Sequence, residues 1–393
     1  MTGPVLVIGI HSSIAIATLR SLSSHGIDCI GISHKSKGAG LWSKHLKKGY
    51  YLRYLPSQAD KYCEQVINIA DLHNCSAIMC HHEQQMIDLN NYIKNSEKKI
   101  NLLFPDNKIL QSILSKSHLL AKASNLGIKT PKTFTLNCID DLIKHADSVE
   151  YPAILKPSAS IQNPPEAWDF KCKYFANSSE LLQLSSSYPD NNAQYILQEY
   201  VTGIYQSIGL AITNGIPVAA FQWVAEREQS IGLGSFRRSV PLNNKLFNKS
   251  VLLCKEMNFN GVCEVEFKTN LLSGESTLME INPRLWGGIS FPIACGVDFP
   301  YMAYQIGLGK TPQPKFQYTT NTWSRNTYGD IKWLINQLIN KNNLLGPKKD
   351  INKINAISEY IRSLGKAISH DLDSSNDPAP SIRHILHKLK IYI

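Results

Sequence analysis

Two short runs of alternating apolar and polar residues constrain the fold of this chain most. In residues 262–268, valine, cysteine and phenylalanine alternate with two glutamates and a lysine, and residues 278–282 follow the same period. A period of two is typical of a half-buried β-strand. Residues 270–276 between the runs contain Asn, Ser and Gly, which favour a turn. The two runs are therefore predicted to form an antiparallel hairpin that folds near Ser273.

The predicted hairpin places acidic side chains opposite one another. In this register Glu266 faces Glu280, and Glu264 faces Asn282. Like charges directly opposite each other destabilise a sheet, and a divalent cation resolves the conflict. A set of oxygen ligands without His or Cys favours Mg²⁺ or Mn²⁺, so Glu266, Glu280 and Asn282 are the predicted metal ligands. The alternative is an exposed polar face on which Arg284 is a simple charge partner.

The end of the hairpin resembles a known family, the ATP-grasp enzymes. A strand glutamate and a Glu-x-Asn pair followed by Arg are similar to that family's site for two Mg²⁺ ions, and the matching positions are Glu266, Glu280, Asn282 and Arg284. Two further runs resemble more narrowly the predicted carboxylate-amine ligases of this superfamily: Leu-Trp-Gly-Gly at 285–288 and Gly-Val-Asp-Phe-Pro at 296–300. The resemblance implies that Arg284 stabilises the transferring phosphoryl group or an acyl phosphate.

Two lysines upstream match further positions of the family. Residues 151–157 form a short apolar run that ends in Lys156, where a point charge can meet phosphate groups. Lys116 opens a helical pattern that closes at Gly127. The resemblance implies that both lysines bind the phosphates of ATP. A solvated surface charge is the alternative for each lysine taken singly.

The segment 195–203 resembles the connection between the two lobes of the family's nucleotide site. There Glu199 and the backbone of Val201 would meet the adenine, whereas the alternative is an ordinary strand that ends in a turn. The acidic residue that usually holds the ribose hydroxyls is missing. Three polar residues remain as candidates for that contact, with Gln206 chosen among Tyr205, Gln206 and Ser207.

Two loops near the phosphates differ in how well they match. After Lys156, residues 158–165 contain serines where many relatives use glycines to bring backbone N–H groups onto the phosphates. Residues 232–239 resemble a glycine-and-arginine loop near the γ-phosphate or the acceptor, with Arg237 as the better match because Arg238 occupies a position that is often acidic. A basic solvent-exposed loop is the alternative.

The N-terminus predicts a parallel sheet. The apolar run 5–10, a helical stretch and a second apolar run at 27–32 form a β-α-β pattern. Only Gly9 of a dinucleotide fingerprint is present, and His11 stands where the second glycine belongs, so a nicotinamide site is disfavoured. The turn at residues 11–13 could meet an anionic acceptor or simply cap the helix.

At 393 residues the chain is predicted to contain two or three domains. The expected fold class is α/β and α+β multidomain, with an N-terminal Rossmann-like parallel sheet followed by a two-lobed ATP-grasp module. The expected division is a Rossmann-like domain at 1–110, a small lobe at 111–196, a large lobe with the Mg²⁺ and ATP site at 197–311, and a basic helical segment at 312–393.

Composition excludes little but agrees with an enzyme. The nine cysteines include no Cys-x-x-Cys pair, which favours reduced thiols, and the cluster of Cys75, Cys80, His81, His82 and Glu83 matches no standard zinc spacing. The formal charge of +10 is spread without a recognised module, so specific nucleic-acid binding is not expected. No apolar run reaches the length of a membrane span and no signal peptide is recognised, so a cytoplasmic location is expected.

The resemblance implies ATP-dependent joining of a small-molecule carboxylate to an amine through an acyl phosphate, with ATP and Mg²⁺ required. Two alternatives remain open. One is a catalytically silent nucleotide-binding or scaffold protein of the same fold, and the other is an oxidoreductase that uses the N-terminal domain. The sequence names neither substrate, and a homodimer is one possible assembly.

Overall fold

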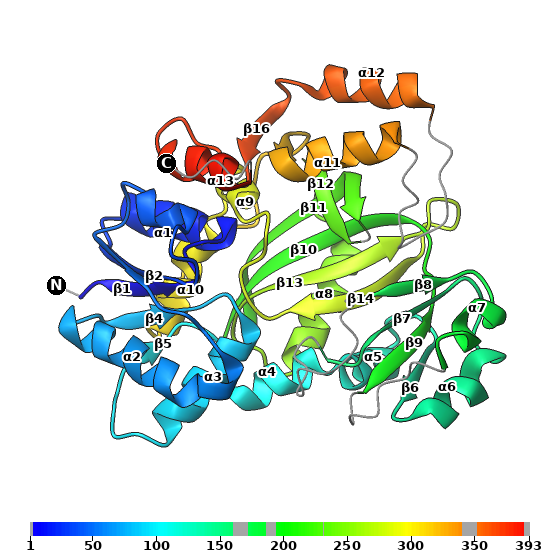
Figure 1. Ribbon diagram of the computed structural model, residues 1–393, viewed down its shortest axis with the longest axis horizontal. Helices are drawn as coiled ribbons and strands as arrows, with labels where there is room; N and C mark the ends of the chain where they lie inside the picture. Colours follow the sequence, from blue (N-terminus) through cyan, green and yellow to red (C-terminus); the bar gives the residue numbers. More distant parts are fainter. Residues whose placement is uncertain (1–2, 160–171, 186–193, 231, 340–351, 389–393) are drawn as a thin grey trace.

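The computed structural model describes residues 3–159, 172–185, 194–230, 232–339 and 352–388. Three sheets organise this part of the chain. In Figure 1 an N-terminal sheet with its helices, in blue, lies on one side of a large central sheet, in green, and a small lobe lies below the other end of the large sheet. Residues 160–165, which belong to the serine-containing loop after Lys156, lie outside the described residues.

The N-terminal sheet has the order β3-β2-β1-β4-β5 and its pairings are all parallel. This confirms the predicted β-α-β opening, because β1 and β2 pair in parallel across α1. The strands are β1 (Val5–Ile8), β2 (Cys29–Ser33), β3 (Lys48–Tyr51), β4 (Ala77–Met79) and β5 (Asn101–Leu102). The α-helices are α1 (Ser13–Ser24), α2 (Ala59–Leu72), α3 (Glu83–Lys94) and α4 (Asn107–Leu114), and the short 3₁₀ helices are η1 (Ala39–Trp42) and η2 (Pro56–Gln58).

The small lobe is an antiparallel sheet of order β6-β9-β7-β8 with its own apolar core. Its strands are β6 (Thr133–Leu136), β7 (Ala153–Pro157), β8 (Lys173–Phe175) and β9 (Tyr195–Glu199), and its helices are α6 (Ile139–Ala146) and α7 (Ser178–Leu182). The preceding helix α5 (Lys116–Asn125) instead contributes its buried leucines to the core of the large sheet. That helix therefore packs outside the lobe to which the expected division assigned it.

The large sheet has the order β14-β13-β10-β11-β12-β15-β16. Its strands are β10 (Ile204–Thr213), β11 (Ile216–Ser230), β12 (Leu233–Ser239), β13 (Gly261–Thr269), β14 (Ser276–Asn282), β15 (Trp323–Arg325) and β16 (Ala367–His370). The helices are α8 (Asn244–Glu256), α9 (Ser290–Ala294), α10 (Phe299–Gly307), α11 (Thr327–Leu338), α12 (Lys353–Ser363) and α13 (Ala379–Lys388).

The C-terminal segment is more than the helical appendage expected from the sequence. Its strands β15 and β16 extend the large sheet beyond β12. Buried ion pairs from Asp330 to Arg227 and Arg325, at 2.7 and 2.8 Å, join α11 to the sheet. The chain then returns to the N-terminal domain, where Arg20 Nε lies 3.0 Å from Asp377 Oδ2, and Figure 1 shows α13 close to α1.

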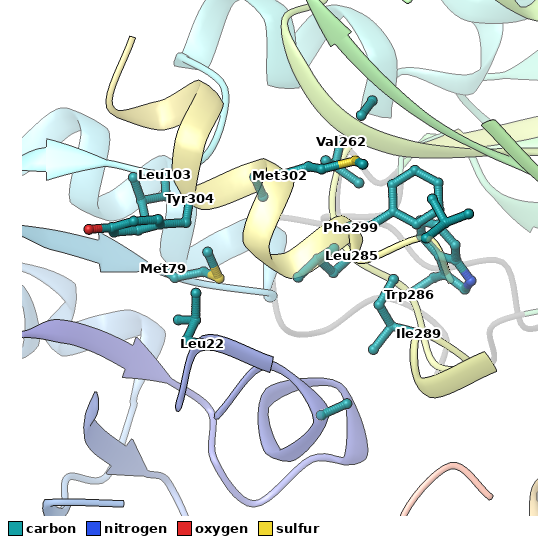
Figure 2. Packing of buried hydrophobic residues seen from close by; sticks show 14 of the residues in the cluster. Leu22, Met79, Leu103, Val262, Leu285, Trp286, Ile289, Phe299, Met302 and Tyr304 are labelled. Atoms are coloured by element: carbon teal, nitrogen blue, oxygen red, sulfur yellow. The ribbon is translucent and has the colours of Figure 1, made fainter. Parts of the chain in front are cut away.

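A shared apolar core connects the N-terminal domain to the large sheet. Leu22, Met79 and Leu103 come from the first domain, and Leu285, Phe299 and Met302 come from the chain that follows β14. Figure 2 shows these side chains in the layer around α10, between the two sheets. The two sheets are therefore fixed relative to each other by packing, and side chains at the ends of β4 and β14 meet at their junction.

Candidate active site

The structure contains the predicted hairpin, and the predicted register holds at its acidic end. An irregularity between Glu266 and Phe267 shifts the pairing nearer the turn, so that Leu278 pairs with Phe267. Glu266 pairs with Glu280 and Glu264 pairs with Asn282 across β13 and β14. The expectation of a half-buried strand is wrong, because both faces of β13 are covered and its polar side chains are buried as well. The alternative of an exposed polar face is excluded for the same reason.

The candidate metal ligands lie together on one face of the sheet. The Asn282 amide nitrogen Nδ2 donates to Glu266 Oε1 at 2.8 Å, which leaves its amide oxygen for another contact. The hydroxyl of Ser207 on β10 donates to Glu264 Oε1 at 2.7 Å. We call this group of Glu264, Glu266, Glu280 and Asn282 the carboxylate cluster.

The carboxylate cluster carries opposed pKa shifts. Burial, together with the nearby Glu280 and Glu264 carboxylates, raises the pKa of Glu266 well above its usual range. Burial also raises the pKa of Glu264, to about 7. Burial works in the same direction on Glu280, but the cations of Lys116 and Lys156 outweigh it and lower the pKa of that carboxyl. Negative charge is thus stabilised at Glu280 and resisted at its neighbours.

Two lysines from different elements face Glu280. Lys116 begins α5, and its Nζ lies 3.7 Å from Glu280 Oε2. Lys156 stands in β7 of the small lobe, where burial and then the like charge of Lys116 lower its pKa to about 8. The sequence placed both lysines on the elements where the structure has them, and the fold brings them over the same carboxylate.

The carboxylate cluster fits a divalent cation that is completed by ligands from a substrate. Among the described residues, no three His, Cys, Asp or Glu side chains are grouped as a complete metal site. Two carboxylates and an amide oxygen are instead the partial oxygen set that Mg²⁺ takes when phosphate oxygens supply the rest. The raised pKa of Glu266 supports this assignment, because a cation would relieve the repulsion that causes part of the shift.

The connection between the lobes lies at the far end of β13. Glu199 accepts a hydrogen bond from the Lys132 backbone N–H at 3.1 Å. The Val201 carbonyl accepts one from Lys268 Nζ at 3.1 Å, and that ammonium also lies 4.9 Å from the centre of the Tyr200 ring. Sequence reasoning did not select Lys268. Lys268 lies two residues after Glu266 in the same alternating run, and this spacing indicates that both side chains share one face of the strand.

Gln206 does not face the carboxylate cluster, so its selection as the ribose contact is not supported by its position. In β10 it pairs with Phe267, whereas its neighbours Tyr205 and Ser207 pair with Lys268 and Glu266. The side-chain amide of Gln206 donates to the Thr269 hydroxyl and accepts from Gln222 Nε2. Since successive side chains of a strand point to opposite faces, Gln206 points away from the candidate site.

Arg284 joins the carboxylate cluster to the N-terminal domain. Its Nε lies 2.6 Å from Glu83 Oε1 at the start of α3, and its Nη1 donates to the Leu285 carbonyl at 3.0 Å. Burial alone would lower the pKa of this guanidinium, but the Glu83 carboxylate outweighs it and raises the pKa. Glu83 is a partner that the sequence did not reveal, because it lies about two hundred residues away in the chain.

Arg237 stands on a strand and not on the expected loop. Residues 233–239 form β12, so Arg237 and Arg238 point to opposite faces. Arg237 is buried against Asp371, with Nη2 2.5 Å from Oδ1, and its guanidinium carbon lies 5.7 Å from the centre of the Trp223 ring. Its charge helps to hold down the pKa of Glu264 against burial. Asp371, which follows β16, is a second partner that the sequence did not reveal.

The polar residues of the N-terminal domain have local partners. Ser12 caps α1 by accepting a hydrogen bond from the Ala15 backbone N–H at 3.3 Å, as the helix-cap alternative predicts. His81 lies 3.2 Å from the Thr18 hydroxyl, and burial lowers its pKa to about 3. The described residues around Cys80 and His81 do not form a zinc site.

Comparison with known proteins identifies a matching family model for one segment of the chain. Residues 191–326 match the family model described as "ATP-grasp in the biosynthetic pathway with Ter operon". This segment contains the hinge, the carboxylate cluster and Arg284. A comparison with curated protein sequences gave no match.

Solved structures resemble nearly the whole chain. An N5-carboxyaminoimidazole synthetase from Staphylococcus aureus, complexed with ADP, is 14% identical, with a TM-score of 0.65 over 93% of this chain and 98% of that one. A biotin carboxylase from Campylobacter jejuni, in a β-γ-ATP complex, is 16% identical, with a TM-score of 0.64 over 82% of this chain and 74% of that one. A biotin carboxylase domain from Hydrogenobacter thermophilus, in complex with MgADP, ADP and bicarbonate, is 16% identical, with a TM-score of 0.63 over 82% and 74%.

The chain has an ATP-grasp fold, and its hinge and large-sheet segment matches an ATP-grasp family model. Within the described residues, none of the helices has the length and apolar character needed to cross a membrane.

Proposed function

We propose that this protein is an ATP-dependent ligase that joins a small-molecule carboxylate to an amine and releases ADP and phosphate. The observation that carries the proposal is the position of Glu266, Glu280 and Asn282 beneath Lys116 and Lys156. Oxygen ligands on one side and ammonium groups on the other form a site for a nucleoside triphosphate with its cation. The ADP and ATP-analogue complexes of the similar structures support the same assignment.

In the proposed first step, a carboxylate oxygen attacks the γ-phosphorus of ATP. The bond from that phosphorus to the β–γ bridging oxygen breaks, and ADP leaves with the electron pair. In the second step the amine nitrogen attacks the acyl carbon, phosphate leaves, and the nitrogen loses a proton. The products are an amide, ADP and phosphate.

The residues of this chain act mainly by position and charge. Lys116 and Lys156 hold the phosphates, and Glu199 with the Val201 backbone receives the adenine at the hinge. Mg²⁺, held by Glu266, Glu280 and Asn282, would neutralise charge on the phosphate oxygens. Arg284 then stabilises the transferring phosphoryl group, while the charge of Arg237 offsets part of the rise that burial causes in the pKa of Glu264. We infer a cytoplasmic location for this chemistry, because ATP is abundant there.

The experiment that tests the proposal is ADP release from ATP and Mg²⁺ across a matrix of carboxylates and amines, with AMP measured in parallel. ADP that depends on a particular pair of substrates supports the ligase. AMP as the product would instead indicate adenylating chemistry. ATP binding without turnover across the whole matrix would favour a silent nucleotide-binding protein of the same fold.

A further inference from the structure

A crevice of about 250 Å³ lies between the N-terminal domain and the end of the large sheet. Met79 from the end of β4, Phe104 after β5 and Ile109 of α4 line one side. Val262 of β13 and Arg284 line the other side. The crevice therefore opens where the C-terminal ends of the parallel strands β4 and β5 meet the hairpin of the candidate active site.

The crevice continues the line of the active site along β13. Lys268, Glu266, Glu264 and Val262 occupy alternate positions of this strand, so they share one face. The hinge lies at the Lys268 end and the carboxylate cluster in the middle. Val262 is one alternate position, roughly 7 Å, beyond Glu264. A nucleotide whose base is at the hinge thus directs its terminal phosphate toward the crevice.

Arg284 lies between the carboxylate cluster and the crevice. Its Nε and Nη1 are used by Glu83 and by the Leu285 carbonyl. Its other terminal nitrogen, Nη2, makes no hydrogen bond within the part of the chain that the structure describes. A guanidinium with one unused terminal nitrogen, at the mouth of a crevice and beside a phosphate site, is suited to a carboxylate.

The charge of the lining favours a single carboxylate group. Among the described residues that line the crevice, Arg284 is the cation and Asp106 is the acid, and the Arg284 charge is already balanced by Glu83. His81 also lines the crevice and stays neutral, because burial lowers its pKa to about 3. The other side chains are mostly apolar. A second carboxylate on the ligand would meet Asp106 and no further cation.

We propose that this crevice binds the acceptor of the ligation and selects a monocarboxylate with an uncharged, apolar body, with Arg284 at its carboxylate and the Met79, Phe104 and Ile109 side chains around its hydrocarbon body. This inference rests on the proposed function. The volume of about 250 Å³ sets the size of that body at roughly eight non-hydrogen atoms, at the ~30 Å³ that a water molecule occupies in the liquid. The acceptor class is therefore that of a small aliphatic or aromatic acid.

The test uses straight-chain monocarboxylates from acetate to decanoate, with hydroxylamine as a general amine that converts an acyl phosphate to a hydroxamate and phosphate. Hydroxamate and ADP are measured in parallel. We expect kcat/KM to rise about fourfold for each methylene until the crevice is full, and then to fall. Dicarboxylates of equal length are expected to be at least about tenfold poorer. A flat response to chain length, or a preference for dicarboxylates, would overturn the inference.

Ile109→Trp and Gln111→Trp form a matched pair on α4, because Ile109 lines the crevice and Gln111 is exposed. Ile109→Trp should raise the KM for octanoate by about tenfold and leave the KM for ATP within about twofold, while Gln111→Trp should change neither. Ile109→Ala should shift the optimum to a longer acid. Equal effects of the two tryptophans would contradict the assignment.

Binding without turnover separates this inference from the proposed function. Octanoate should raise the Tm of the unaltered protein and of Gln111→Trp, but not that of Ile109→Trp. If this pattern holds while no acid gives ADP, the crevice assignment stands and the ligase proposal fails. If acids of another class give ADP while octanoate leaves every Tm unchanged, the ligase proposal stands and the apolar acceptor is excluded.

Discussion

The two faces of β13 are both buried, but they differ completely in chemistry. Cys263, Val265 and Phe267 are at most 1% exposed, and Glu264, Glu266 and Lys268 are at most 9% exposed. The first set packs in an apolar core, where loss of contact with water is favourable by itself. The second set gains nothing from burial unless charges of opposite sign arrive from elsewhere.

The charges that stabilise the polar face come from all parts of the chain. Lys116 and Lys156 approach Glu280, Glu83 reaches Arg284, and Asp371 reaches Arg237. The comparison shows that the apolar face stabilises the large sheet by packing. The polar face instead depends on the folded sheet to bring its charged partners into place. Truncation of a side chain on the apolar face should therefore lower stability, whereas removal of a charged group on the polar face should mainly change ligand chemistry.

The largest effect is expected on the apolar face. Phe267→Ala removes a fully buried ring and should lower the free energy of unfolding by about 3–5 kcal/mol. Denaturant titration of the variant measures this loss. Glu266→Gln, at the neighbouring position on the polar face, is the control and should leave the stability equal or higher, because it removes a charge that Glu280 repels. An equal loss in both variants would remove the distinction between the faces.

On the polar face the effect should appear in activity. Glu280→Gln removes a candidate metal ligand and should lower Mg²⁺-dependent ATP turnover by at least about 100-fold while the Tm stays close to that of the unaltered protein. Glu275→Gln is the matched control, since Glu275 is an exposed glutamate in the turn of the same hairpin. Normal turnover in Glu280→Gln would exclude this metal assignment.

Gly209 tests how closely the polar face is covered. A Cβ at this position of β10 would lie 2.3 Å from Cη2 of the Trp286 ring. Gly209→Ala should therefore cost about 1–3 kcal/mol in the free energy of unfolding, because a buried ring cannot move aside freely. Trp286→Phe removes the clashing atoms, so the double variant should be more stable than the sum of the single losses predicts. Strict additivity would show that the two residues do not interact.

Lys156→Ala should weaken ATP binding about tenfold, because a charge-assisted contact to phosphate is lost. Isothermal titration with ATP and Mg²⁺ measures the change. Lys173→Ala is the control, since Lys173 is an exposed lysine on the adjacent strand β8. If both variants bind ATP as the unaltered protein does, the phosphates lie elsewhere.

The smallest effect concerns pH. With its pKa lowered to about 8 by burial and by Lys116, Lys156 is protonated below pH 8 and loses its charge above it. Phosphate binding favours the charged form, so ATP affinity should fall a few-fold as the pH rises from 7 to 9. In Lys156→Arg the charge persists through this range, and the decline should be reduced. An equal decline in both proteins would assign the titration to another group.

The sequence by itself determined the local elements of the site. The period of two and the turn residues at 270–276 predicted the hairpin and the pairing of its acidic end, both of which the structure has, but not the register shift that follows Glu266. The apolar run before Lys156 and the helix that begins at Lys116 were equally readable. Each of these depends on residues that are close in the chain, so the backbone periodicity is enough to place them.

Only the tertiary structure decided which faces are covered and which charges meet. In β10 every residue after Ile204 is buried, and the pairing with β13 decides which of its side chains face the carboxylate cluster. The sequence of β10 therefore did not show that Gln206 points away from the cluster. Glu83, Asp371 and the crevice beside Arg284 come from elements far apart in sequence. A local pattern records how a strand alternates, but the packing of distant elements selects the partners of its side chains, because burial makes unpaired charges too costly to leave alone.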